Sequence, residues 1–214
     1  MAPPPIRFCR LCGAPTTQRV PALEDRPRAV CTACGYVDYV NPINVVGTVP
    51  VWWEEADGPR ILLCRRSIEP RAGFWTLPAG FLEVGETSSQ GASRETLEEA
   101  GARVEIEGLF SVIDLEFSAQ LHVYYRARLL DLDLAPGPET IENLLVRPSE
   151  IPWDDLAFRT VRRTLEFWTK DLASGAGFGV HHDELAPPSP ELLAQLKAQP
   201  RPGTPATLDQ PPSL

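Results

Sequence analysis

The sequence predicts an α/β domain with a mixed sheet, preceded by a small cysteine-rich module. Two Cys-x2-Cys pairs occupy the first part of the chain, which indicates a module held together by a metal. From residue 45 to residue 172, apolar runs typical of strands alternate with two patterns of helical period. A chain of 214 residues with 43% hydrophobic and 23% charged residues can bury the core of such a domain.

The cysteine pairs come first along the chain. Cys9-x2-Cys12 and Cys31-x2-Cys34 are separated by 18 residues, a spacing found in four-cysteine zinc sites. A glycine follows each pair and allows the tight turn that directs backbone amides toward the sulfurs. Two disulfides are the alternative, but no export signal precedes the pairs. We therefore predict a zinc ribbon over residues 6–40, in which the four thiolates hold a structural Zn²⁺.

The remaining elements follow from periodicity and turn residues. A valine-rich run and a second apolar run, separated by a turn at 56–59, predict a pair of strands. Near the end, Val161, Leu165, Trp168 and Leu172 recur at helical spacing and predict a core-facing helix. The expected elements are strands at 45–53, 60–65, 104–114, 121–130 and 144–147, and helices at 88–100 and 155–172.

Acidic residues are concentrated in the segment GFLEVGETSSQGASRETLEEAGA, residues 80–102. Glu95, Glu98 and Glu99 fall at i, i+3 and i+4 and therefore share one face of the predicted helix, beside Arg94. Like charges at these spacings repel each other, whereas a hard cation such as Mg²⁺ prefers oxygen ligands. A solvated acidic helix face is the alternative, but here a glycine-bounded loop precedes the helix and a glycine closes it. The pattern predicts a divalent-cation site.

This segment resembles the Nudix box, G-x5-E-x7-R-E-U-x-E-E-x-G-U, in which U is an aliphatic residue. The departures are Thr96 and Ala102 at the two U positions. Every named position is filled, by Gly80, Glu86, Arg94, Glu95, Glu98, Glu99 and Gly101. The resemblance implies an α/β/α sandwich with a mixed sheet. It also implies hydrolysis of a nucleoside diphosphate linked to another group, with Mg²⁺ or Mn²⁺ as the catalytic cation.

The resemblance assigns the metal ligands. Glu95, Glu98 and Glu99 would bind Mg²⁺ or Mn²⁺ and take part in catalysis, and the carbonyl of Gly80 would add a further oxygen ligand. Such cations neutralise the phosphates, which otherwise repel a nucleophile, and they lower the pKa of a bound water.

The other roles are less uniform among proteins of this family. Glu86 and Arg94 would join the loop to the helix through an ion pair. The general base is either Glu95 or a glutamate in the later segment PGPETIENLL, where Glu139 and Glu142 are the candidates. Glu142 is the favoured one because it is expected to precede a strand directly.

The substrate class rests on a narrower resemblance. A zinc ribbon ahead of a Nudix domain resembles the NADH pyrophosphatases, but residues 103–140 contain nothing like their SQPWPxPxS motif. The runs YVDYVNPINVVGTV, WTLPAGFLEVGE, APGPETIE and IPWDDLAF resemble instead the ADP-ribose and FAD pyrophosphatases of the plastid type. This resemblance spans roughly residues 7–182. It implies FAD or ADP-ribose as substrate, cleaved to AMP plus the phosphate of the other group.

Two other functions stay open. One is cleavage of a capped RNA end, with the ribbon contacting the RNA. The other is a protein that senses nucleotides without cleaving them, although such proteins usually lose box carboxylates that this chain retains. The net charge of −9 argues against non-specific binding to nucleic acid or anionic membranes. We therefore expect a small nucleotide as the partner and nucleic acid as an unlikely one.

The predicted organisation is a ribbon at 6–40, a Nudix domain at 41–183 and a proline-rich tail at 184–214, in which only 191–199 has the pattern of a short helix. The tail is interpreted either as a segment without function or as an arm that covers a partner subunit in a homodimer. No apolar run approaches the roughly 20 residues that span a bilayer, and the N-terminus lacks the features of an export signal. We therefore expect a cytoplasmic protein.

Overall fold

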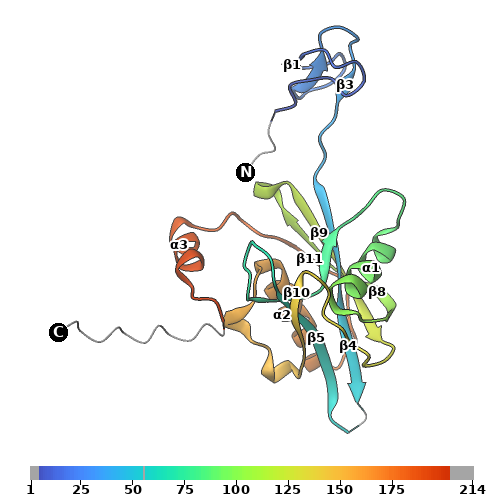
Figure 1. The fold of residues 1–214 in the computed structure, drawn as a ribbon, viewed down its shortest axis with the longest axis vertical. Coiled ribbons are helices and arrows are strands. Elements are labelled where there is room, and N and C mark those ends of the chain that lie inside the picture. Colours follow the sequence, from blue (N-terminus) through green and yellow to red (C-terminus); the bar gives the residue numbers. More distant parts are fainter. Residues whose placement is uncertain (1–4, 55, 203–214) are drawn as a thin grey trace, which may run out of the picture.

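The computed structural model describes residues 5–54 and 56–202. These residues form a small three-stranded sheet and a larger domain built on an eight-stranded sheet, with the small sheet projecting from one end of the domain (Figure 1). In the described part of the chain no helix has the length and apolarity needed to cross a membrane.

The small sheet is antiparallel and contains β1 (Thr16–Arg19), β2 (Arg28–Cys31) and β3 (Val37–Asp38) in that order. Its interior is slight: the buried side chains include Ala29, Val30 and two cysteines. So few apolar contacts cannot hold a fold of this size, which agrees with the prediction that a metal stabilises it.

The domain is organised around one long strand, β4 (Ile43–Glu54). It pairs antiparallel with β5 (Gly58–Arg66) and parallel with β9 (Gln120–Leu129), so the sheet is mixed as predicted. The sheet order is β10-β5-β4-β9-β8-β11, while β6 pairs with β5 and β7 with β4. The other strands are β6 (Trp75–Thr76), β7 (Ala79–Phe81), β8 (Val104–Leu115), β10 (Thr140–Val146) and β11 (His181–Glu184).

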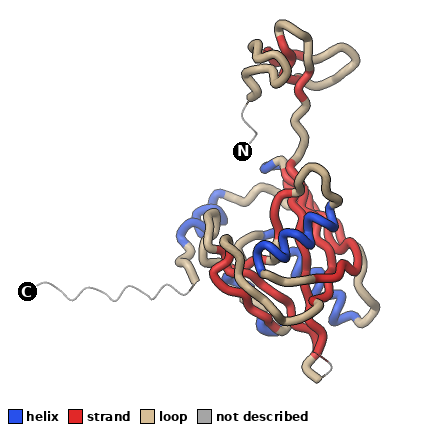
Figure 2. The backbone as a smooth tube through the Cα atoms, turned by 45° about the vertical axis from the view of Figure 1, so that its right-hand side comes forward, coloured by secondary structure: helices blue, strands red, loops and turns tan. Residues whose placement is uncertain are grey.

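Helices α1 (Ser88–Ala100) and α2 (Arg159–Ser174) cover opposite faces of the sheet (Figure 2). Successive residues of β5 show the two layers, because neighbouring side chains of a strand point to opposite faces. Ile61 and Leu63 pack in the cluster that contains the buried face of α2. Leu62 and Cys64 pack in a second cluster with the end of α1. The α/β/α sandwich is therefore confirmed.

The two largest differences between predicted and observed boundaries arise from tertiary pairing. Helix α2 begins at Arg159 rather than at residue 155, because the backbone N–H of Ala157 donates to the carbonyl of Trp75, at 2.7 Å, instead of to a helical turn. Strand β10 begins at Thr140 rather than at residue 144, because its first residues pair with the end of β5. Glu142 thus lies within the strand, and the reason for favouring it as general base was wrong.

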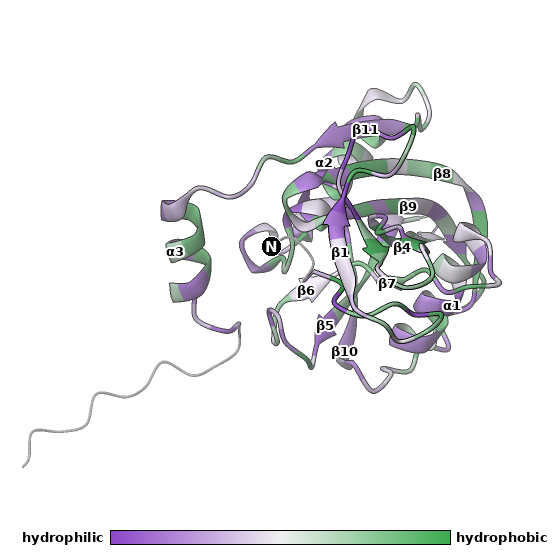
Figure 3. Ribbon diagram, turned by 90° about the horizontal axis from the view of Figure 1, so that it is seen from above, coloured by the Kyte–Doolittle hydropathy of each residue, from purple (hydrophilic) through white to green (hydrophobic). Residues whose placement is uncertain are grey.

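The C-terminal segment contains α3 (Pro190–Ala198), close to the short helix expected at 191–199. The side chain of Ser189 caps it by accepting from the N–H of Leu192 at 3.2 Å. The helix lies beside its own domain, joined to it by the segment after β11 (Figure 3). Residues 203–214 of the predicted tail lie outside the described residues.

Candidate active site

The acidic segment forms a loop followed by α1, with the boundaries that the sequence predicted. Thr87 and Gln90 make a reciprocal capping box at the start of α1, and Gly101 ends the helix in the left-handed conformation at φ 64°. Thr96, one of the departures from the box pattern, is buried and shares a 2.6 Å hydrogen bond with Thr48 of β4. The threonine thus ties the helix to the sheet through a polar contact where an aliphatic residue would pack.

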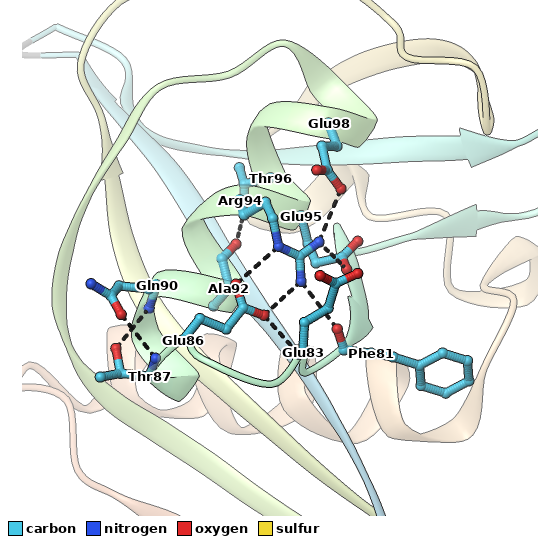
Figure 4. Close-up of polar contacts among 10 residues, drawn as sticks. All are labelled: Phe81, Glu83, Glu86, Thr87, Gln90, Ala92, Arg94, Glu95, Thr96 and Glu98. Carbon is cyan, nitrogen blue, oxygen red and sulfur yellow. Dashed lines mark hydrogen bonds and ion pairs between the residues drawn. The ribbon is translucent and has the colours of Figure 1, made fainter.

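Arg94 connects the loop to the helix (Figure 4). Its guanidinium donates to both carboxylate oxygens of Glu86, at 3.0 and 2.7 Å, and to the carbonyl of Phe81 at 3.1 Å. It also donates to Glu95 at 2.7 Å and to Glu98 at 3.0 Å. The hydrogen bonds from Arg94 are the main cause that lowers the pKa of Glu86 to about 2. One arginine therefore neutralises part of the negative charge of three glutamates.

Glu99 lacks such a partner. Its side chain is buried, with 8% exposed, and it forms no ion pair among the described residues. Its Oε2 accepts only a long hydrogen bond, 3.3 Å, from the N–H of Ala79. Burial is the main cause that raises its pKa to about 8, and the charge of Glu95 adds to the effect. A buried carboxylate without a cation is costly, so this environment fits a divalent metal ion.

Gly80 lies directly against this carboxylate cluster. A side-chain carbon placed there would overlap the carboxylate of Glu95, so the close approach of strand β7 to α1 requires a glycine. The strand and helix thus bring the Gly80 backbone and the carboxylates of Glu95 and Glu99 together. Three of the suggested cation ligands are therefore neighbours in the structure, and Arg94 links the fourth, Glu98, to Glu95.

Gly80→Ala is expected to reduce turnover far more than stability, because the added methyl displaces the end of a flexible carboxylate rather than backbone. The free energy of unfolding should fall by about 1 kcal/mol or less, while kcat/KM should fall by at least about tenfold. Gly108→Ala is the matched control, since its new methyl would meet only Arg126, at 3.8 Å. Equal losses of stability and turnover in Gly80→Ala would contradict this role of the glycine.

The two later glutamates lie in different places. Glu142 on β10 is bound to Arg65 at 2.8 Å and is half-exposed. Glu139 precedes β10 in the loop. Burial is the main cause that raises the pKa of Glu95 and Glu99, and the negative charge of Glu139 adds a smaller contribution to both. Of the two, Glu139 is therefore the one that acts on the carboxylate cluster.

The four cysteines form a compact group. Their sulfurs all lie within 4.8 Å of one another, and the closest pairs are 3.4 to 3.7 Å apart. Four thiolates about 2.3 Å from one zinc ion would be separated by about 3.8 Å, so the arrangement fits a tetrahedral site. Backbone amides, first that of Cys34 and also that of Ala33, donate to Cys31 at 3.4 Å and lower its pKa to about 6. Such donors stabilise a thiolate ligand.

Sequence reasoning did not single out one arrangement near the cluster. The guanidinium of Arg66 lies over the ring of Phe158, 4.9 Å from its centre, and its charge acts on Glu99 to oppose the rise in pKa. Its position depends on the pairing of β5 with β6 and on the extended residues before α2, which no local pattern indicates.

The architecture and the carboxylate-bearing loop and helix define the class of proteins with a Nudix fold. Residues 45–166, more than half of the chain, match the NUDIX domain, and residues 7–40 match the Nudix N-terminal zinc ribbon. A crystal structure of a NUDIX hydrolase from Nitrosomonas europaea is 42% identical, with a TM-score of 0.78, over 84% of this chain and 99% of that one. The chain belongs to the Nudix family.

Curated relatives match over shorter stretches. An NAD-capped RNA hydrolase, NudC, from Haemophilus influenzae strain PittGG is 36% identical over 102 residues, which are 46% of this chain and 34% of that protein. The mitochondrial NAD(P)H pyrophosphatase NUDT13 of Mus musculus is 31% identical over 116 residues, 54% of this chain and 28% of that protein. The chain spans about a third of the length of these relatives.

Proposed function

We propose that this protein hydrolyses the pyrophosphate of a dinucleotide or related nucleoside diphosphate derivative with an adenosine half. FAD and ADP-ribose are the substrates that the sequence favours, and the names of the relatives add NAD(H). The observation that carries the proposal is Glu99, a buried carboxylate without a cation partner, grouped with Glu95 and the Gly80 backbone.

The residues have distinct parts in this reaction. Glu95, Glu98 and Glu99 would hold Mg²⁺ or Mn²⁺, which when bound neutralises the phosphates and lowers the pKa of a water molecule. Arg94 fixes the carboxylates of Glu95 and Glu98 in position through its hydrogen bonds. Glu139 lies in the loop that is joined to α1 by the hydrogen bond from the N–H of Gly137 to the carbonyl of Glu99, at 2.9 Å. It forms no ion pair among the described residues, and in our proposal it takes the proton from the attacking water.

Glu139→Gln is expected to lower kcat by about 10²- to 10⁴-fold with little change in KM, because general-base catalysis contributes on that scale. Glu142→Gln is the matched control: it removes an ion pair with Arg65 at the surface and should change kcat only slightly. Steady-state kinetics with one substrate would compare the two variants. The opposite ranking would assign the base to Glu142, and full activity of both would point to Glu95.

A second candidate function is cleavage of an NAD-capped RNA, which the name of the Haemophilus protein suggests. The ribbon offers modest support. Arg10 is bound to Asp38 at 2.5 Å and Arg28 to Glu24 at 3.0 Å, so their charges are largely balanced within the ribbon. The support therefore comes from the other arginines of the ribbon, which are Arg7, Arg19 and Arg26.

Product analysis by chromatography tests the proposal. The purified protein would be incubated with Mg²⁺ or Mn²⁺ and FAD, ADP-ribose, NADH, diadenosine polyphosphates or an NAD-capped RNA. AMP together with the phosphate of the other half would support the proposal and identify the branch. Cleavage of the RNA alone, with a steep loss on added salt, would favour the second function. No cleavage of any substrate would overturn both and favour nucleotide sensing.

A further inference from the structure

A cavity of about 1170 Å³ lies between α3 and the domain. Its walls are largely apolar, and they come from the hairpin between β8 and β9, from the start of α2 and from α3. The main apolar contributors are Leu115, Phe117, Leu156 and Phe158 on the domain and Leu192 and Leu196 on α3. The volume lies slightly above the range of about 300–1,000 Å³ that is typical of ligand pockets.

Helix α3 is anchored to the domain near both of its ends, and the cavity lies between the helix and the domain. At its C-terminal end, Arg71 donates to the carbonyl of Leu196 at 2.8 Å and to the side chain of Gln199 at 2.7 Å. The amide of Gln199 donates to the carbonyl of Asp154 at 2.6 Å. Before the helix, Arg159 donates to the carbonyl of Ala186 at 2.7 Å. The helix therefore stands over the domain as an outer wall rather than filling the space.

The cavity is connected to the carboxylate cluster through Arg66. This arginine lies over the ring of Phe158, which lines the cavity, and it pairs in the sheet with Thr140, the residue after Glu139. Among the described residues its side chain forms no ion pair and donates a hydrogen bond only to the carbonyl of Pro70, at 3.0 Å. No side chain caps the adjacent N-terminus of α2, whose dipole also favours an anion. A phosphate is the group that suits this position.

The lining suits a flat, heteroaromatic ring. Phe117 and Phe158 provide aromatic surface, and apolar side chains dominate the rest. His122 also lines the cavity, and its buried Nδ1 has no hydrogen-bond partner in the described part of the chain. Burial holds the pKa of His122 down at about 4, so the neutral ring can exchange a hydrogen bond with a base.

We propose that this cavity binds the aromatic ring of one half of the substrate, with the adjoining phosphate at Arg66 and α3 as the outer wall. The inference rests on the proposed function and deepens it: the occupant is a nucleoside 5′-monophosphate unit whose base is adenine, nicotinamide or flavin. Leu192 and Leu196 determine affinity for the ring, although they lie far along the chain from the catalytic box.

Equilibrium binding without added divalent cation tests the proposal independently of turnover. AMP, nicotinamide mononucleotide and FMN supply the three bases, and ribose 5-phosphate supplies the same phosphate without a ring. At least one of the three is expected to bind about tenfold more tightly than ribose 5-phosphate, since stacking contributes on that scale. Hydrogen exchange within residues 190–198 should slow on binding. Equal affinity for ribose 5-phosphate, or unchanged exchange in α3, would overturn the proposal.

Paired substitutions on α3 locate the site. Leu192→Gln with Leu196→Gln makes the inner face of the helix polar and should weaken binding of the preferred mononucleotide about tenfold. Ala194→Gln with Lys197→Gln changes residues outside the cavity lining and should leave binding unchanged. Glutamine is a good helix former, so both pairs preserve α3. Unaltered binding in the first pair would overturn this inference and leave the proposed function intact. If the wild type kept this binding pattern but hydrolysed none of the substrates, the proposed function would be overturned and the binding site would stand.

Discussion

Glu99→Gln should lose most of its turnover and yet make the metal-free protein more stable at alkaline pH. The loss of kcat/KM is expected to be on the order of 10³-fold, the upper range for removing a single electrostatic group from an active site. The reason is that Glu99 is the most buried of the three helix carboxylates and has no cation of its own. Its charge is available to a metal ion, and glutamine cannot supply it.

The gain in stability follows from the direction of the pKa shift. The folded pKa of Glu99 is about 8, above the ordinary value of 4.5, so the folded state holds this proton more tightly than the unfolded state does. The contribution of this proton to the free energy of unfolding is present at low pH and is lost as pH rises from 4.5 through 8. Glutamine carries no such cost. Each unit of pKa shift corresponds to about 1.4 kcal/mol, and 1 kcal/mol changes Tm by about 2–4 °C in a protein of this size.

Thermal unfolding of the metal-free proteins at pH 5 and pH 9 would measure this effect, with activity assayed in parallel. The variant should match the wild type at pH 5 and exceed it at pH 9. Glu116→Gln, at an exposed position remote in sequence from the box, is the matched control and should change neither quantity. A variant that is inactive because it is unfolded, or one that retains full turnover, would contradict the role assigned to Glu99.

The second large effect is expected in the ribbon. Cys31→Ser should release zinc and unfold residues 7–40, because the buried interior of the ribbon is too small to fold without the metal. Structural zinc contributes about 10–16 kcal/mol to folding in isolated finger peptides, far more than this interior can replace. The sheet domain has its own core and should remain folded, with α1 and its carboxylates in place.

Elemental analysis would measure the zinc content, and hydrogen exchange along the chain would report separately on the ribbon and on the sheet domain. One zinc per chain is expected in the wild type and none in Cys31→Ser, with fast exchange confined to the ribbon. Cys64→Ser provides the control, because Cys64 is buried in the domain beside Leu62 and should leave zinc content unchanged. Slow exchange of a zinc-free ribbon would refute the metal site.

The sequence was most informative where local signals decide the structure. Helix α1 has the predicted bounds because a capping box begins it and a left-handed glycine ends it. The carboxylate cluster was likewise predictable, since helical spacing alone places Glu95, Glu98 and Glu99 on one face. The cysteine spacing predicted a group of four sulfurs that the structure contains.

The features that were missed depend on pairing between distant segments. Strand β11 has the sequence HHDE, which carries no apolar pattern; it forms because it lies parallel to β8 and because Asp171 holds His181 at 2.8 Å. The distinction between Glu139 and Glu142 required the register of β10 against β5. The cavity required the position of α3, which is set by hydrogen bonds from Arg71 and Arg159 across long stretches of sequence.

Arg94 gives the catalytic loop a property beyond its ion pairs. Because it already bridges Glu86, Glu95 and Glu98, the loop and helix are assembled before any cation arrives. The entropic cost of ordering the loop therefore arises once, during folding, rather than each time a metal ion binds. A metal ion would therefore enter a preformed site and could leave it without unfolding the loop, so the protein would keep its shape while the concentration of divalent ions changes.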